Sequence, residues 1–416
     1  MIRLSLGSRR RNAVALLAAI LVVAVVYRFI VQGYLVSWIE SATYEDKVRR
    51  LVDTVGSEVA RLRGFPPPSG ISVRVVSIEF FKSDTRQSLE NDPKLIAQET
   101  LCKALLMVPK DFSLLEKKVG LSGIILAAAA GTTIYVVREY FNPDDKGALG
   151  TIAHEYTHVL QYVYQPHYDT ATTDSGQALS ALTEGEAGLV ADLYTTNATG
   201  RAFSPQIPEP ASQKPYGADS GWVLDRLFWF PYEHGEDFVY RIYQGGGWQA
   251  VNQVYAKPPS CTAQILHIDR LSDFQPVSLP NPKPVRGDWS ISYSDTLGEY
   301  SIQLLLLQAL RPVVAESATS EWIGDNATIY LSNRTYLLQW QSQWKNEESA
   351  SDFAVTLSNF FQSMGGVKES ELYWDFDGRL ITLKQSGQKV ILVGSSDKQL
   401  LLDETEQFDF SHKDAT

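Results

Sequence analysis

The segment His154-Glu155-Tyr156-Thr157-His158 constrains this chain more than any other. It reads H-E-x-x-H, and the apolar residues on both sides of it favour a buried helix. Two histidines four positions apart lie on one helix face, about one turn apart, so both imidazoles can reach a single metal ion. Glu155 lies about 100° round the helix from His154, where it can hold a water rather than the metal. The motif predicts a zinc site with Glu155 as general base; the alternative is a surface helix with two solvated histidines.

A hydrolytic zinc site takes three protein ligands and leaves one position for water, so His154 and His158 need a partner from another element. Glu184, on a helix expected over Gln177–Thr195, is the best candidate. Glu186 is the alternative ligand. Side chains two positions apart on a helix point to different sides, so only one of the two glutamates can bind the metal. We expect the other to be a solvated surface glutamate.

The combination of H-E-Y-T-H with E-G-x-A at Glu184–Ala187 resembles the gluzincin metallopeptidases. In that class the glutamate of E-G-x-A is the third zinc ligand, which implies Glu184 here. The chain also resembles a family of predicted bacterial metallopeptidases that are membrane-anchored or lipoproteins. This resemblance rests on five segments: His158–Gln161, Phe230–Tyr232 with Gly235, Gly246–Asn252, Gln264–His267 and Trp322–Asp325. It implies a zincin-like fold and a peptide or protein substrate. The chain departs from the family at Ala263, where the family tends to have glutamate.

Peptide hydrolysis also needs a donor for the developing oxyanion. Tyr232 is our candidate, because it resembles the tyrosine of a Y-x-x-G segment in related gluzincins. His234 and His267 are alternatives for this role, and a packed core tyrosine is the alternative interpretation of Tyr232. Ligating histidines usually donate their other N–H to a carboxylate or carbonyl, and Asp192 is a possible acceptor.

The N-terminus carries a membrane signal. Arg9-Arg10-Arg11 precedes an apolar run over residues 13–31, and its length of about 19 residues is close to that of a membrane span. The arginines should stay in the cytoplasm, which predicts a single-pass cell-membrane protein with an extracytoplasmic catalytic domain. A cleaved signal peptide is the alternative, although no small-x-small site follows the run.

The expected fold class is α+β, with five parts along the chain. Residues 1–36 form a cytoplasmic tip and transmembrane anchor, and residues 37–68 a stalk helix over Tyr44–Arg63 with a proline linker. Residues 69–278 form a zincin-like catalytic domain, residues 285–396 a small α+β module, and residues 397–416 a tail.

Local patterns give elements within these parts. Ile71–Phe81 is β-branched and alternating, which predicts a strand. The apolar run Leu121–Val137 predicts a short buried helix followed by strand Thr132–Val137, whose edge could pair with an extended peptide. The C-terminal module should contain helices Leu297–Leu310 and Ser349–Ser363, strand Tyr336–Trp344, and a hairpin of Arg379–Gln385 and Lys389–Val393.

Composition excludes some functions. A formal charge of −11 with no basic stripe beyond the N-terminus argues against nucleic acid as a partner. Cys102 and Cys261 are the only cysteines, and the sequence leaves open whether they pair. The leading prediction is a membrane-anchored zinc peptidase. The alternatives are a catalytically silent zincin scaffold that binds a cell-surface partner, and a zinc hydrolase acting on another bond.

Overall fold

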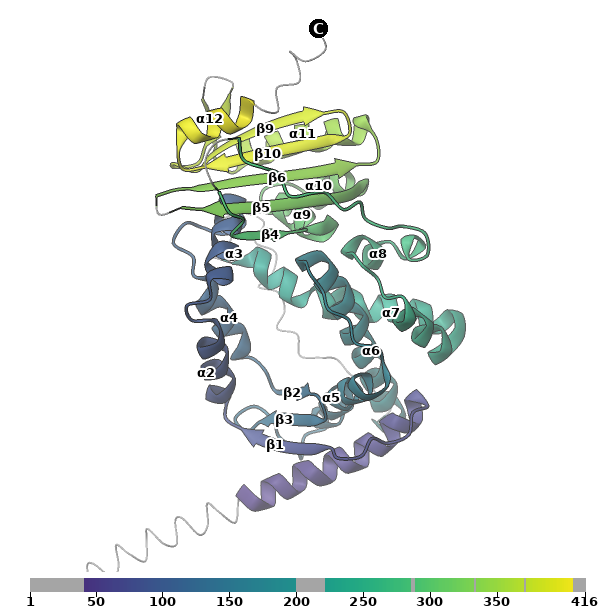
Figure 1. The fold of residues 1–416 in the computed structure, drawn as a ribbon. Coiled ribbons are helices and arrows are strands. Elements are labelled where there is room, and N and C mark those ends of the chain that lie inside the picture. The colour runs from purple at the N-terminus through teal and green to yellow at the C-terminus, as the bar shows by residue number, and fades with distance from the viewer. Residues whose placement is uncertain (1–40, 200–220, 286–288, 333, 370–371, 407–416) are drawn as a thin grey trace, which may run out of the picture.

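The computed structural model describes residues 41–199, 221–285, 289–332, 334–369 and 372–406. This part of the chain contains twelve α-helices and two β-sheets (Figure 1). This confirms the α+β class. The N-terminal helix spans 41–63. The other helices are α2 (Ile78–Leu89), α3 (Pro93–Ala104), α4 (Leu114–Ser122), α5 (Gly147–Tyr164), α6 (Thr173–Thr199), α7 (Trp222–Ala256), α8 (Thr262–Leu266), α9 (Gly298–Leu307), α10 (Pro312–Thr319), α11 (Glu347–Ser363) and α12 (Lys398–Glu406). The strands are β1 (Ser72–Val76), β2 (Ala127–Ala130), β3 (Thr133–Val137), β4 (Tyr293–Asp295), β5 (Trp322–Leu331), β6 (Tyr336–Trp344), β7 (Val367–Glu369), β8 (Tyr373–Asp375), β9 (Leu380–Ser386) and β10 (Lys389–Ser395).

The smaller sheet has the strand order β1-β3-β2, with β1 parallel and β2 antiparallel to β3. Strand β3 confirms the predicted strand at the end of the apolar run, but it is the central strand. The free edge of β2 lies beside α5. The prediction of a helix at the start of the apolar run Leu121–Val137 is wrong, because α4 ends at Ser122 and the next element is strand β2. Gly131, with φ of 60°, permits the tight turn between β2 and β3.

The strand predicted over Ile71–Phe81 is correct only in its first half. β1 ends at Val76, and α2 begins at Ile78. Phe80 stacks on Tyr135 of β3 with ring centroids 5.8 Å apart. Helix α2 therefore covers the smaller sheet with aromatic residues, in a segment whose β-branched, alternating pattern predicted a strand.

The N-terminal helix lies where the sequence predicts it, and one of its faces is buried against the motif helix. Its four valines (Val48, Val52, Val55 and Val59) share a core with α5 and the smaller sheet. The helices approach closely at Gly56, where a Cβ atom would overlap the ring of Tyr156. The helix that we expected to be a stalk is therefore part of the folded unit, and Figure 1 shows it beneath the smaller sheet.

The larger sheet has the order β4-β5-β6-β10-β9-β8-β7, and every neighbouring pair is antiparallel. It confirms the predicted strand Tyr336–Trp344 and the C-terminal hairpin. Side chains alternate between its two faces: Val390 and Leu392 join the main core beneath α11, whereas Ile391 and Val393 pack with Leu401 of α12. Helix α12 lies in the segment that we expected to be a tail.

Helix α6 connects the two halves of the molecule. Its first half contributes Ala178 and Leu182 to the core shared with the larger sheet, and its second half contributes Val190 and Ala191 to the core around α5. None of the helices in the described ranges is long and apolar enough to cross a membrane. The anchor predicted over residues 13–31 lies outside those ranges.

Buried carboxylates fix the junction between α6 and the larger sheet. Asp295 of β4 accepts the backbone N–H of Thr173 at 2.7 Å and its hydroxyl at 2.6 Å, which holds the first residue of α6. Asp174 accepts the backbone N–H and hydroxyl of Thr262 at 2.7 and 2.6 Å, which attaches α8 to the same point. Burying carboxylates is costly unless they are hydrogen-bonded, and both of these are.

Asp325 completes this junction. It accepts backbone N–H groups from Leu297 and Gly298 and the indole N–H groups of Trp322 and Trp340, at 2.9 to 3.1 Å. This explains the W-x-G-D segment. Its tryptophan donates a hydrogen bond to its aspartate across the β-bulge between Trp322 and Gly324.

The buried Asp174 should make stability depend on pH. Burial raises its pKa from 3.8 to about 7. Because this pKa is raised in the folded state, the unfolded chain releases the proton first, and the free energy of unfolding falls as pH rises from about 4 to about 7. The loss at high pH is at most about 4 kcal/mol. Asp174→Asn keeps an oxygen for Thr262 and should remove this loss.

We therefore expect Asp174→Asn to be more stable than the wild type at pH 8, with a smaller difference at pH 4.5, as measured by urea unfolding. Asp169→Asn, at an exposed position just before α6, is the control and should follow the wild type at both pH values. An equal effect of Asp174→Asn at both pH values would contradict the prediction.

Candidate metal centre

Helices α5 and α6 bring the three predicted ligands together. His154 Nε2 lies 3.0 Å from Glu184 Oε2 and 3.2 Å from His158 Nε2, and His158 Nε2 lies 3.3 Å from Glu184 Oε2. Among the described residues, these three form the one group of histidine, cysteine and acidic side chains that could hold a metal ion. Glu184, rather than Glu186, is the glutamate that faces the histidines.

The spacing of these atoms suits zinc. Tetrahedral zinc with bonds of about 2.0–2.1 Å separates its ligand atoms by about 3.3 Å, which is close to the observed 3.0 to 3.3 Å. Burial alone would lower the pKa of His158, but Glu184 beside it raises that pKa to about 10. Burial alone would raise the pKa of Glu184, and the two histidines instead hold it well below its usual range. Glu184 therefore stabilises positive charge beside it, for which a proton on His158 and a metal ion would compete.

Glu155 lies outside this ligand triangle and faces the smaller sheet. Its carboxylate is buried and accepts a hydrogen bond from the backbone of Ala129 in strand β2. Burial raises the pKa of Glu155, and the positive character of His154 and His158 opposes that rise. The carboxylate is therefore held between the motif helix and the edge strand, next to the histidines.

Tyr232 of α7 also reaches the centre. Its ring lies nearly parallel to that of His154, with centroids 6.3 Å apart, and its hydroxyl forms a hydrogen bond with Glu184. Burial, together with the carboxylates of Glu184 and Glu155, raises the pKa of Tyr232 well above its usual value. The phenol therefore keeps its proton and can act as a hydrogen-bond donor.

The two other histidines that we considered contact α9 instead. The ring of His234 packs against Phe230 and Tyr300, and burial together with Arg226 lowers its pKa to about 4. His267 Nε2 lies 2.7 Å from Glu299 Oε1. The structure thus brings Tyr232, but neither of these histidines, into contact with the metal-binding side chains.

The acceptor behind His158 is Gln161, which sequence reasoning missed. Its Oε1 lies 2.8 Å from His158 Nδ1. Asp192, the acceptor that we considered, lies near Glu236; burial and the charge of Asp192 raise the pKa of Glu236 to about 7. The i,i+3 spacing of histidine and glutamine on one helix was a signal for this contact.

Glu186 is not the solvated surface residue that we expected. Its side chain is buried and forms an ion pair with Arg63, the last residue of the N-terminal helix, which is also buried. The expectation was wrong because a distant helix supplies the counter-charge. The small neighbours Gly185 and Ala187 were the only local sign of burial.

Helices α6 and α7 hold Glu184 and Tyr232 together through two glycines. A Cβ atom on Gly185 would overlap the carbonyl of Gly235, and one on Gly235 would overlap the carbonyl of Ala181. The backbones therefore touch at the level of the centre. This contact accounts for the glycine of E-G-x-A and for Gly235 of the Y-x-x-G segment.

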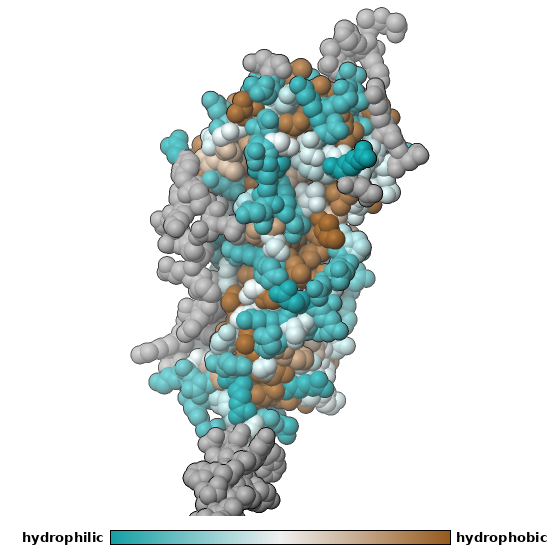
Figure 2. Space-filling view, turned by 90° about the vertical axis from the view of Figure 1, so that its left-hand side faces the viewer, coloured by the Kyte–Doolittle hydropathy of each residue, from teal (hydrophilic) through white to brown (hydrophobic). Residues whose placement is uncertain are grey.

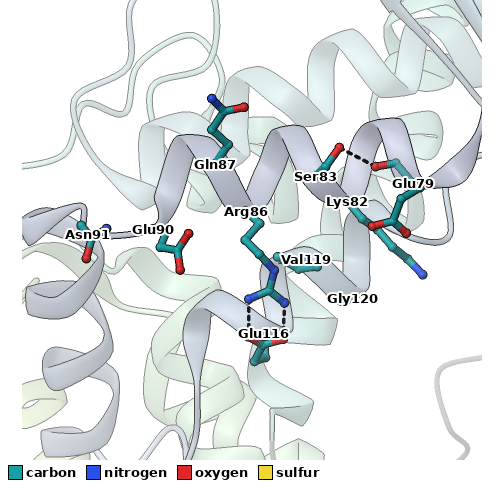
Figure 3. A pocket seen from close by; sticks show the side chains of 10 residues that line it. All are labelled: Glu79, Lys82, Ser83, Arg86, Gln87, Glu90, Asn91, Glu116, Val119 and Gly120. Atoms are coloured by element: carbon teal, nitrogen blue, oxygen red, sulfur yellow. Dashed lines mark hydrogen bonds and ion pairs between the residues drawn. The ribbon is translucent and has the colours of Figure 1, made fainter.

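A separate depression lies between α2 and α4, on a face where polar and apolar side chains are interspersed (Figure 2). Its lining is mostly charged or polar, and Arg86 forms two hydrogen bonds of 2.7 Å with Glu116 across it (Figure 3). No residue of the metal centre lines it.

Residues 289–404 match a family described as a domain of unknown function, DUF8575. The matched segment begins just before β4 and ends in α12, so it corresponds to the larger sheet and its covering helices. The chain matches no curated protein and no solved structure. The match does not include His154, His158 or Glu184 of the candidate metal centre.

Cys102 and Cys261 are both buried, unpaired thiols. Burial raises the pKa of Cys102 to about 12, so this thiol is not a reactive nucleophile.

The close contact of α6 and α7 can be tested at Gly235. Gly235→Ala should lower the free energy of unfolding by about 1–3 kcal/mol, because a backbone carbonyl cannot move aside for the new methyl group. Gly245→Ala, in the same helix with no neighbouring atom within 4 Å of the added carbon, should be neutral or stabilising by up to about 1 kcal/mol. Urea unfolding measures both, and wild-type stability of Gly235→Ala would refute the close contact.

Proposed function

We propose that the protein is a zinc-dependent peptidase with a zincin-like fold and the two-histidine, one-glutamate ligand set of the gluzincins. The observation that carries this proposal is the convergence of His154, His158 and Glu184 within 3.3 Å of one another, with Glu155 beside them and outside the triangle. Two histidines and a glutamate leave a fourth position for water or substrate.

Zinc bound at this position would polarise a water and the substrate carbonyl. Glu155 would accept the proton of the attacking water and later deliver it to the leaving amine. Its position beside the two histidines and its hydrogen bond from the backbone of Ala129 favour this role. The hydroxyl of Tyr232, which retains its proton, would donate a hydrogen bond to the developing oxyanion.

Strand β2 supports a peptide or protein as the substrate. An extended peptide can add to an open sheet edge through main-chain hydrogen bonds, and β2 has such an edge beside α5. Three of the four alanines of β2 are half-buried and the last is exposed. Because Glu155 accepts a hydrogen bond from the backbone of Ala129 in β2, a peptide paired with β2 would run past the proposed general base.

Anchorage in the lipid bilayer through residues 13–31, with the catalytic part extracytoplasmic, remains part of this proposal. It rests on Arg9-Arg10-Arg11 ahead of the apolar run. The acidic net charge of −11 makes nucleic acid an unsuitable partner.

Metal analysis tests the ligand set. The purified wild type should retain about one zinc per chain after dialysis, and both His158→Ala and Glu184→Ala should lose it, because each removes one of three ligands. His167→Ala, at an exposed histidine near the end of the motif helix, is the matched control and should keep its zinc. Full zinc content in Glu184→Ala would exclude Glu184 as a ligand.

Turnover tests the enzymatic role. A diverse peptide library, read by mass spectrometry, first identifies a substrate. Glu155→Gln should then reduce the rate by about 10²–10⁴-fold with zinc content and melting temperature unchanged, because glutamine can hold the water but cannot accept its proton. Tyr232→Phe should cost about 10²-fold. Cleavage by Glu155→Gln at the wild-type rate would exclude Glu155 as the general base, whereas failure of the wild type to cleave any library peptide would favour a silent scaffold.

A further inference from the structure

A buried polar network lies behind His158 and joins four elements. Arg63 comes from the N-terminal helix, Gln161 from α5, Glu186 from α6, and Tyr255 from α7. All four residues are buried. Glu186 forms an ion pair with Arg63 and also accepts hydrogen bonds from the Tyr255 hydroxyl and from Gln161 Nε2, the latter at 2.9 Å.

The hydrogen-bond direction within this network is fixed. Carboxylates and backbone carbonyls only accept hydrogen bonds, so the end of the Gln161 amide that faces them must be its NH₂ group. That nitrogen lies 2.9 Å from Glu186 Oε2 and 2.8 Å from the carbonyl of Thr183. The amide oxygen therefore faces His158 Nδ1 at 2.8 Å, and Nδ1 must be the donor. The lone pair of a neutral His158 is then on Nε2, which is the nitrogen that faces His154 and Glu184.

Arg63 holds the carboxylate end of this chain of hydrogen bonds. Its side chain has no exposed surface, and besides Glu186 it donates to Asn252 Oδ1 at 3.0 Å. Its guanidinium carbon lies 4.1 Å from the ring centre of Trp248 and 4.9 Å from that of Phe65. These contacts allow Arg63 little freedom to move, so the carboxylate of Glu186 is held against Gln161.

The glycine-rich segment of α7 serves this network. Gly246 and Gly247 break the helix, and Gly247 has φ of 61°, which glycine adopts readily. After the break, Trp248, Asn252 and Tyr255 recur at helical spacing and all contact Arg63, Glu186 or Gln161. The Gly246–Asn252 segment therefore forms one wall around Arg63.

We propose that Arg63 is a positioning residue for the metal centre. Through Glu186 and Gln161 it fixes Nδ1 of His158 as a donor and so keeps Nε2 available to the metal. This inference rests on the proposed metal site, but it does not require that the protein be a peptidase. Without Arg63, the carboxylate of Glu186 loses its counter-charge and its fixed position, so that Gln161 and the His158 ring bonded to it are held less firmly.

The first test compares Arg63→Met with the wild type in the full-length chain. Zinc affinity is measured by competition with a chelator, and Co²⁺ absorption reports the ligand geometry. Loss of a side chain that orients a ligand typically costs 10–100-fold in metal affinity, and we expect a loss in this range. Arg61→Met is the matched control: Arg61 lies on the same helix, is exposed and pairs with Glu58 at the surface. It should bind zinc like the wild type.

A second test keeps Arg63 in place and reverses the polarity of its partners. Gln161→Glu alone puts two carboxylates against each other and should weaken zinc binding by at least about tenfold. Adding Glu186→Gln restores a hydrogen-bond donor between the new carboxylate at position 161 and the guanidinium. The double variant should therefore recover part of the lost zinc affinity, although its carboxylate at position 161 still faces the carbonyl of Thr183.

The outcomes separate the two proposals. No zinc binding by the wild type would overturn the metal centre itself. If the wild type binds zinc and Arg63→Met binds it with the same affinity, only the role of Arg63 is overturned. If Arg63→Met fails to fold, as judged by its melting curve, the second test decides: recovery in the double variant supports the role, and equal affinities of single and double variants reject it.

Discussion

The buried ion pair between Arg63 and Glu186 is the interaction on which the half of the structure with the candidate metal centre depends. Neither side chain reaches solvent, so removing either partner would leave an uncompensated charge in the core. The charges are tolerable because Asn252, Tyr255 and Gln161 provide further hydrogen bonds to the pair. The pair therefore requires the N-terminal helix, α5, α6 and the second half of α7 to assemble together, and the candidate metal ligands lie on two of these helices.

The sequence predicted the centre better than its surroundings. His154 and His158 followed from helical spacing, and Glu184 followed from a resemblance that the geometry fits. The same reasoning missed Arg63 and Gln161 and placed Glu186 at the surface. Local periodicity shows which face of a helix carries polar groups. It does not show that a helix more than a hundred positions away supplies their partners.

The errors in the fold have a similar origin. The alanine run of β2 lacks the β-branched residues that mark strands, and its conformation is set by pairing with β3. In the same way, the segment of α2 was predicted as strand because it continues the β-branched, alternating run of β1, although Phe80 and Phe81 pack on Tyr135 from a helix. The C-terminal elements were predicted more closely. The alternation along β10, with Val390 and Leu392 on one face and Ile391 and Val393 on the other, is visible in the sequence itself.

The larger sheet matters to the centre through α6. Asp295 and Asp174 fix the start of this helix to β4 and α8, and Glu186 is fixed to Arg63 further along it. Glu184 lies between these anchors, about 16 Å from the first residue of the helix. A ligand triangle with sides of 3.0 to 3.3 Å tolerates little movement of any member. Because α6 is held on both sides of Glu184, the helix can neither slide nor rotate. The region that matches DUF8575 therefore helps to define the geometry of the candidate metal centre, although this region contributes no ligand.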